Sequence, residues 1–385
     1  MRKTVLYKAC VLICLMALFC TFLAGCTQKY TRPLDEEPKA VEPVGQVPEE
    51  FADIVENNLF YDVTAFDDRL LKTEICDYDE ENHIMEQRVW MMDLYGKELA
   101  SYTCTADDAY SVQTLVATAD GGFLFVLGFD ERYRDGQWTT EMGFASRVIK
   151  CDSDGNVQFD TALADIEGRS LRFCFEKDEK YYFFGEVETP ETKTLGVGSP
   201  SDIYMAILDQ DGKLLKTNLI AGSDFDDLYH AEMADGGFEL SILAQSDDGD
   251  FAGSDSGGYG VNWVFTVDDE LQIIQREKRT GRDYSDYWIG EKDGKPVHKS
   301  DPLFDGFDAG SVQAYIDYGD FYLIVSENNT GVYENTPGMI SRIWYYTETV
   351  YSVYDNSGKL IFRAAVDSSP DYDSFVSYYE GMGIE

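Results

Sequence analysis

The chain has 385 residues, with 31 lysines and arginines against 72 aspartates and glutamates, and a net charge of −41. So large an excess of negative charge repels nucleic acid and anionic lipid headgroups, which excludes nucleic-acid binding as the function. The length suits one large β domain or two smaller domains.

The first 25 residues are predicted to be a secretion signal. Arg2, Lys3 and Lys8 form a positive start, and the apolar run 11–23 is too short and too near the end for an ordinary membrane-spanning helix. The run ends in Leu23-Ala24-Gly25-Cys26, which resembles the lipobox of bacterial lipoproteins. The alternative is a membrane helix that happens to contain cysteines.

The lipobox resemblance implies removal of residues 1–25 and attachment of diacylglycerol to the thiol of Cys26, which becomes the new N-terminus. Two or more acyl chains such as palmitate on one residue give a stable anchor. We therefore expect a lipoprotein on the extracytoplasmic face of a bacterial cell membrane, exposed at the cell surface. Removal of three basic residues and no acidic ones changes the net charge from −41 to −44.

Residues 26–50 are predicted to form a lipid-anchored, acidic linker. Four of the ten prolines lie here, at 33, 38, 43 and 48, and no hydrophobic period is present. The folded domain is then expected to span residues 51–385. Solubility at a crowded surface explains the acidic composition of that domain, and affinity for cations, cationic ligands or neutral sugars is the alternative explanation.

Two turn motifs repeat along the folded region. The segment Asp120-Gly121-Gly122 recurs as Asp235-Gly236-Gly237, and a DxxG motif ends in Gly96, Gly155, Gly212 and Gly358. Gly96, Gly155 and Gly212 are spaced by 59 and 57 residues, and apolar runs flank each turn, which is typical of strand–turn–strand units. A copy near Asp268 lacks its glycine.

A period of about 58 residues with four strands per unit is the signature of a propeller blade. The alternating DGGF and DxxG motifs resemble the repeats of bacterial secreted β-propellers. We therefore predict an all-β fold, a β-propeller of about five four-stranded blades near 57–104, 108–165, 168–220, 228–280 and 310–367. Six blades, one of them degenerate, is the alternative, and residues 371–385 are expected to pair with the first blade.

The connections between strands predict two unequal faces. The DGG and DxxG turns share one face and are short, whereas the loops 130–143, 188–201, 245–260 and 327–346 and the link 284–310 share the other. Long loops on one face indicate a contact surface. Its aromatic residues are candidates for binding a glycan, a peptide or an envelope protein, with packing onto the ring as the alternative: Tyr133, Trp138, Phe251, Tyr259, Tyr287, Trp288 and Tyr333.

Metal sites and disulfides have weaker signals. A glycine-rich loop holds Asp247, Asp248, Asp250 and Asp255, which are oxygen ligands of the kind that calcium prefers, but without the EF-hand spacing. No CxxC motif occurs, and the three histidines show no ligand spacing with the cysteines, so zinc is not predicted. Export permits the disulfides Cys76–Cys104 and Cys151–Cys174, and buried free thiols are the alternative.

No catalytic motif stands out in the sequence. HExxH, a P-loop and GxSxG are absent, and no pair of carboxylates among so many is distinguished as a glycosidase pair. We therefore expect a non-enzymatic lipoprotein that binds a ligand or envelope partner through its loop-rich face. A glycosidase-like enzyme of the same fold and a protein–protein docking scaffold are the alternatives, because propellers serve all three purposes.

Overall fold

The computed structural model describes fourteen stretches of the chain. They are residues 41–79, 84–107, 110–129, 133–134, 137–138, 146–163, 170–188, 201–253, 260–279, 288–292, 295–299, 301–304, 307–334 and 342–368. The predicted signal, Cys26 and the pairing of residues 371–385 with the first blade lie outside these residues. Within them, no helix has the length and apolar character needed to cross a bilayer.

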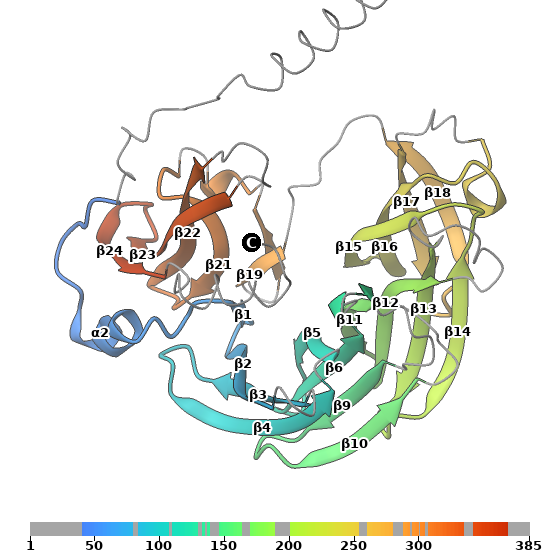
Figure 1. Ribbon diagram of the computed structural model, residues 1–385, viewed down its shortest axis with the longest axis horizontal. Helices are drawn as coiled ribbons and strands as arrows, with labels where there is room; N and C mark the ends of the chain where they lie inside the picture. Colours follow the sequence, from blue (N-terminus) through green and yellow to red (C-terminus); the bar gives the residue numbers. More distant parts are fainter. Residues whose placement is uncertain are drawn as a thin grey trace, which may run out of the picture.

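Five four-stranded antiparallel sheets lie around a common centre, like the blades of a propeller (Figure 1). The first blade consists of β1 (Val63–Ala65), β2 (Leu70–Asp79), β3 (Ile84–Met92) and β4 (Glu98–Asp107). The second consists of β5 (Tyr110–Ala117), β6 (Phe123–Phe129), β9 (Arg147–Cys151) and β10 (Val157–Ala162). The third consists of β11 (Ser170–Lys177), β12 (Lys180–Glu188), β13 (Ser201–Asp209) and β14 (Leu214–Ile220). The fourth consists of β15 (Asp226–Ala234), β16 (Gly237–Ala244), β17 (Val261–Asp268) and β18 (Ile273–Arg279). The fifth consists of β21 (Ser311–Asp317), β22 (Phe321–Glu334), β23 (Arg342–Asp355) and β24 (Leu360–Asp367). The predicted all-β propeller fold and its five four-stranded units are confirmed.

The link between the fourth and fifth blades forms a two-stranded hairpin instead of a sixth blade. Its strands are β19 (Trp288–Lys292) and β20 (Lys295–His298), and a short 3-10 helix (Pro302–Phe304) follows. The hairpin packs against β21 and β1, close enough that a Cβ on Gly290 would meet the Tyr315 carbonyl at 2.2 Å. It therefore belongs to the inner wall of the ring beside the fifth blade.

The first and fifth blades are joined by the segment that precedes β1. Val44 pairs with Arg363 on β24, and helix α2 (Glu49–Glu56) buries Phe51 and Ile54 in a cluster with Ile316 and other core residues of the fifth blade. Val44 and the first turn of α2 therefore lie within the residues that the sequence assigned to the linker. Pro48 is the N-cap of α2 and has an extended conformation, so this proline lies at a helix start.

The DxxG turns share one hydrogen-bonding scheme. The carboxylate of Asp152 accepts the backbone N–H groups of Asp154 and Asn156 at 2.9 Å each, and the other four turns repeat this pattern. The fourth residue is in the left-handed conformation, with φ of +83° at Gly155. In the copy without glycine, Leu271 adopts this conformation with φ of +56° and is fully buried. The core contact of its side chain offsets the backbone strain.

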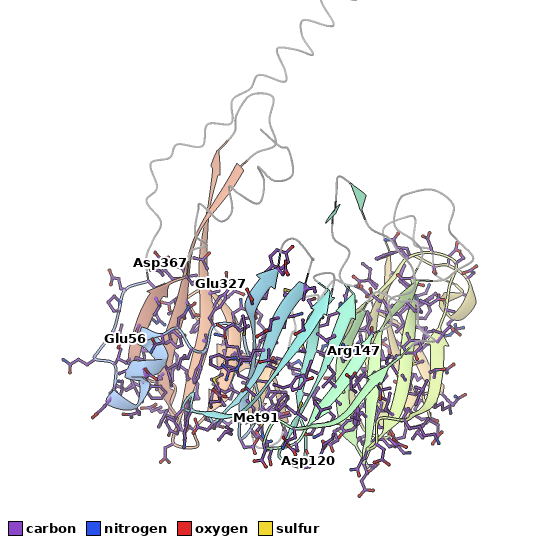
Figure 2. The ribbon with its side chains drawn as sticks, turned by 60° about the horizontal axis from the view of Figure 1, so that its bottom comes forward. Glu56, Met91, Asp120, Arg147, Glu327 and Asp367 are labelled. Atoms are coloured by element: carbon purple, nitrogen blue, oxygen red, sulfur yellow. The ribbon has the colours of Figure 1, made fainter. Side chains whose placement is uncertain are left out.

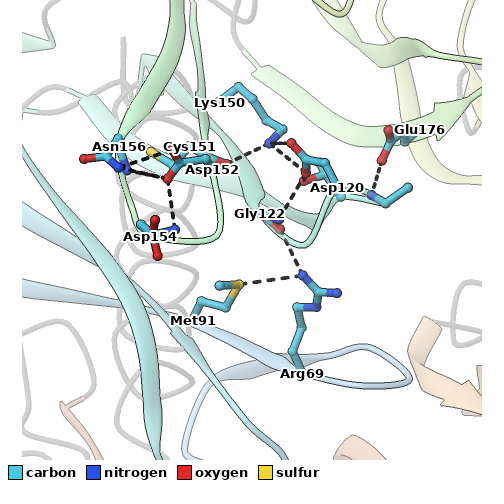
Figure 3. Close-up of polar contacts among 12 residues, drawn as sticks. Arg69, Met91, Asp120, Gly122, Lys150, Cys151, Asp152, Asp154, Asn156 and Glu176 are labelled. Carbon is cyan, nitrogen blue, oxygen red and sulfur yellow. Dashed lines mark hydrogen bonds and ion pairs between the residues drawn. The ribbon is translucent and has the colours of Figure 1, made fainter.

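The two glycines of the DGG turn have different roles. Gly121 has φ of +88°, which favours glycine, whereas Gly122 lies so close to the next strand that a Cβ would meet the Cys151 carbonyl at 2.2 Å. This turn also holds a buried ammonium group: the Lys150 side chain is fully buried, and its Nζ lies 2.9 Å from an Asp120 oxygen (Figure 3). Burial would raise the pKa of Asp120, but hydrogen bonds from Thr118, Lys150 and Gly122 lower it to about 2.

We predict that Gly122→Ala destabilises the protein more than Gly121→Ala. The first substitution forces a methyl group onto a backbone carbonyl, which costs about 3 kcal/mol of unfolding free energy as overpacking. The second mainly places an L-residue in the left-handed region, where its nearest neighbour is 3.7 Å away, at a cost of about 1–2 kcal/mol. Urea unfolding of both variants measures the difference, and equal losses would contradict this assignment of roles.

Candidate functional site

The two faces of the ring are built unequally. The short turn at Asp120 lies on one side, while the hairpin of β7 (Tyr133–Arg134) and β8 (Gln137–Trp138) and the far ends of β22 and β23 project from the other (Figure 2). Strands β22 and β23 pair continuously from Phe321 and Asp355 to Glu334 and Arg342. Residues 327–334 and 342–346 of the predicted loop 327–346 are therefore paired strand, and this pair extends beyond its blade.

The predicted aromatic binding residues do not form one described cluster. Tyr133, Trp138 and Tyr333 belong to the projecting strands β7, β8 and β22, and Trp288 belongs to β19 in the inner hairpin. Tyr259 and Tyr287 lie outside the described residues. The prediction that Phe251 binds a ligand is wrong. This residue lies in the 3-10 helix Gly249–Phe251, and its side chain is 0% exposed and packs against Trp263 and Phe265, so it is a core residue.

The predicted calcium ligands act on nearby backbone instead of facing one another. Asp248 accepts the N–H of Ser223 at 2.9 Å, and Asp250 accepts the N–H of Ala221 at 3.0 Å. Asp247 is exposed, and Asp255 lies outside the described residues. These carboxylates fasten the link between the third and fourth blades to the β16–β17 connection, and calcium binding at this loop stays a prediction.

A different set of metal-ligating side chains meets at the inner edge of the fourth blade. His230 and Glu232 on β15 and His298 on β20 each offer a ligand atom, and these three atoms all lie within 4.8 Å of one another. Glu232 Oε2 is 3.6 Å from Nε2 of each histidine. The two imidazole centroids are 5.5 Å apart at an interplanar angle of 67°. The set therefore joins the fourth blade to the inner hairpin.

A second charged cluster begins three residues earlier on β15, roughly 10 Å along the strand. Arg172 of β11 lies 3.0 Å from Asp227 and 3.3 Å from Glu186, which is buried. Burial, followed by a hydrogen bond with Asp227, raises the pKa of Glu186, and the Arg172 charge opposes this rise. A carboxyl group with so perturbed a pKa beside a second carboxylate is typical of functional sites and of structural ion-pair networks alike.

A β-bulge recurs in the innermost strands. In four of the five blades, the first and second strands shift register at one residue: Gln113, Arg172, Tyr229 and Gln313. Bulges of this kind bend a strand and redirect a side chain next to functional sites. On β15 the bulge at Tyr229 directly precedes His230 and so contributes to the position of the candidate site.

Sequence reasoning missed the His230, Glu232 and His298 set. Side chains two residues apart on a strand point to the same face, so the His-x-Glu pair on β15 was the one sequence signal for this site. No sequence spacing relates it to His298, which comes 66 residues after Glu232. The ring brings them together because β15 and the hairpin both line its interior.

The four cysteines after residue 26 are free thiols. Cys76 is exposed, whereas Cys104, Cys151 and Cys174 are buried in separate strands. Burial raises the pKa of Cys104 to about 11 and that of Cys151 to about 12, so both are protonated and unreactive at neutral pH. Of the two alternatives left open by the sequence, the free-thiol arrangement is the one present.

Comparison with known proteins gives a likeness of fold. No protein-family model and no curated protein matches the chain. Cobalt-substituted Synechocystis ACO and a substituted Synechocystis apocarotenoid oxygenase each match at 10% identity and a TM-score of 0.33, over 77% of this chain. An ACO/RPE65 chimera matches at 10% identity and a TM-score of 0.35. The match covers 58% of each of these solved chains.

This comparison corrects the expectation of a non-enzymatic protein. The solved chains that match are forms of an oxygenase, at TM-scores of 0.33 to 0.35. The likeness concerns the fold alone, and no activity, substrate or metal is carried over from these proteins to this chain.

The Asp226 carboxyl group, on the same strand as His230 and Glu232, is buried and has a shifted pKa that can be tested. Asp226 is fully buried, and its oxygens accept the N–H of Ser246 at 3.2 Å and the Ser246 hydroxyl at 2.8 Å. Burial raises the pKa of Asp226 to about 7, against the opposing effect of these hydrogen bonds. The folded protein therefore holds a proton at this position that the unfolded chain releases near pH 4.

We predict that Asp226→Asn flattens the pH dependence of stability. Between about pH 4 and pH 7 the folded state binds one more proton than the unfolded state, so stability falls as the pH rises, by at most about 1.4 kcal/mol per unit. Urea unfolding at pH 5 and pH 8 should show a smaller decline in the variant. Asp247→Asn, at an exposed position, is the control and should keep the wild-type decline. Equal declines in all three proteins would refute the assignment.

Proposed function

We propose that the protein is a lipid-anchored, extracytoplasmic β-propeller that binds an extended segment of an envelope protein through the face bearing β7–β8 and β22–β23. The anchor is proposed from the signal-like residues 1–25 and Cys26. The binding face is proposed from one observation, the β22–β23 hairpin, which continues past the rest of its blade.

The support for peptide binding comes from the edges of that hairpin. Strand β21 pairs with β22 up to Glu327, and β24 pairs with β23 from Glu348. The N–H and the hydroxyl of Ser368 both donate to the Thr347 carbonyl. Beyond these points, the described pairing of residues 329–334 and 342–346 is with each other alone. Strand edges of this kind accept an extended peptide through main-chain hydrogen bonds.

The net charge and the proposed anchor narrow the class of partner. A chain with a net charge of −44 after removal of the signal favours a neutral or basic peptide, since like charges suppress association. A tether at Cys26 would hold the ring near the membrane, where segments of envelope proteins are at high local concentration.

We predict that Cys26→Ser releases the protein from the membrane. A serine hydroxyl cannot accept the diacylglycerol that the thiol receives, so the variant should move from the detergent-extractable membrane fraction to the soluble fraction and lose labelling by a palmitate analogue. Cys20→Ser, a matched change within the predicted signal, should remain anchored and labelled. Retention of label or membrane association in the Cys26 variant would contradict the proposed anchor.

We predict that shortening the β22–β23 hairpin weakens partner binding without unfolding the ring. Replacing residues 330–346 by Asn-Gly leaves Asn329 opposite Thr347 in a two-residue turn and keeps the four strands of the blade. On peptide and glycan arrays, the wild-type protein should bind peptides, and the variant should bind at least about tenfold more weakly, a loss of about 1.4 kcal/mol.

Two comparisons make this experiment decisive. Asp235→Asn alters an exposed residue in a short turn of the fourth blade and should leave peptide binding unchanged. Thermal unfolding should give the same midpoint for the shortened variant and the wild type. The proposed function is wrong if the wild type binds glycans alone or nothing, or if the shortened, folded variant binds as tightly as the wild type.

A further inference from the structure

We propose that His230, Glu232 and His298 bind one divalent first-row transition-metal ion, of which zinc is the reference case. The three side chains come from two elements, β15 of the fourth blade and β20 of the inner hairpin. The bound ion would connect these elements at the place where the regular succession of blades is interrupted.

The distances fit a shared ion better than direct contact. Each Nε2 lies 3.6 Å from the same carboxylate oxygen of Glu232, which is longer than the 2.7–3.2 Å of an N–H···O hydrogen bond. With metal–ligand bonds of about 2.1 Å in a tetrahedral site, neighbouring ligand atoms stand about 3.4 Å apart. The two carboxylate–imidazole distances are thus close to this spacing, and the imidazole ligand atoms lie within 4.8 Å of each other, so a bound ion would draw the two rings together.

The ligand types select the class of metal. Two imidazoles with one carboxylate suit zinc and its neighbours in the first transition row, whereas calcium and magnesium prefer oxygen ligands throughout. All three side chains are reachable, since His230 is 18% exposed, His298 is 20% exposed and Glu232 is 37% exposed.

The backbone holds the ligands in place before an ion arrives. His230 and Glu232 point from the same face of β15, and the His230 ring packs edge-on against Phe173 of β11. The hairpin that carries His298 is fixed by its contact with β21 and by a hydrogen bond from the Asp67 N–H to Glu291. Preorganisation of this kind reduces the entropy that binding costs.

Three ligands from the described residues leave a fourth tetrahedral position. Sites of this kind, with three protein ligands and one exchangeable position, bind water or a small ligand there, in contrast to closed structural sites. We therefore assign the site as open, with the fourth position available to solvent.

The test uses the full-length protein, freed of metal with a chelator and titrated with zinc and with cobalt(II). The wild type should bind one ion with micromolar or tighter affinity, and cobalt should give the visible absorption of a four-coordinate site. His298→Gln and Glu232→Gln should each weaken binding at least about tenfold. His83→Gln removes the remaining histidine and should bind like the wild type.

Two further measurements separate a lost site from a lost fold. Zinc at 100 times its dissociation constant should raise the unfolding free energy of the wild type by about 2.7 kcal/mol, and that of the two variants by much less. Azide should change the cobalt spectrum if the fourth position is open. An absence of tight binding, or equal binding in His298→Gln, would overturn the site, and an unchanged spectrum with azide would overturn its open position.

Discussion

The whole ring depends on one small hydrogen-bonding unit, an aspartate carboxylate that accepts two backbone N–H groups of its own turn. It occurs at the third-to-fourth turn of each of the five blades, with a left-handed residue at its fourth position. A turn this short sets the register of two strands and leaves little variation in their length. Its recurrence makes each blade similar enough to stack on the next around a common centre.

The blades are joined on the short-turn side by polar contacts between neighbours. Thr161 of the second blade donates to the Gly212 carbonyl of the third, and Asn218 of the third donates to the Leu271 carbonyl of the fourth. Lys177 of the third blade pairs with Asp269 of the fourth. Because these contacts occupy one face, the opposite face is free to carry the projecting hairpins.

The proposed activities use the two departures from the repeat. The β22–β23 hairpin is longer than the other two strands of its blade, and the β19–β20 hairpin is a two-stranded insertion between four-stranded blades. Side chains from a blade and from an inserted hairpin can meet only where the insertion reaches the ring interior. The His230, Glu232 and His298 set arises in this way.

The sequence by itself determined the class of fold, the four-stranded repeat and the short-turn face, because turn chemistry and strand alternation are local properties; it left five or six blades open, and the structure has five four-stranded sheets. It also located the missing glycine near Asp268, whose place Leu271 takes. Only the tertiary structure decided that Phe251 is core, that the segment from Val44 joins the first and fifth blades, and that His298 meets Glu232. These contacts join residues distant along the chain, so their geometry follows from how the sheets curve and close, which no local pattern encodes.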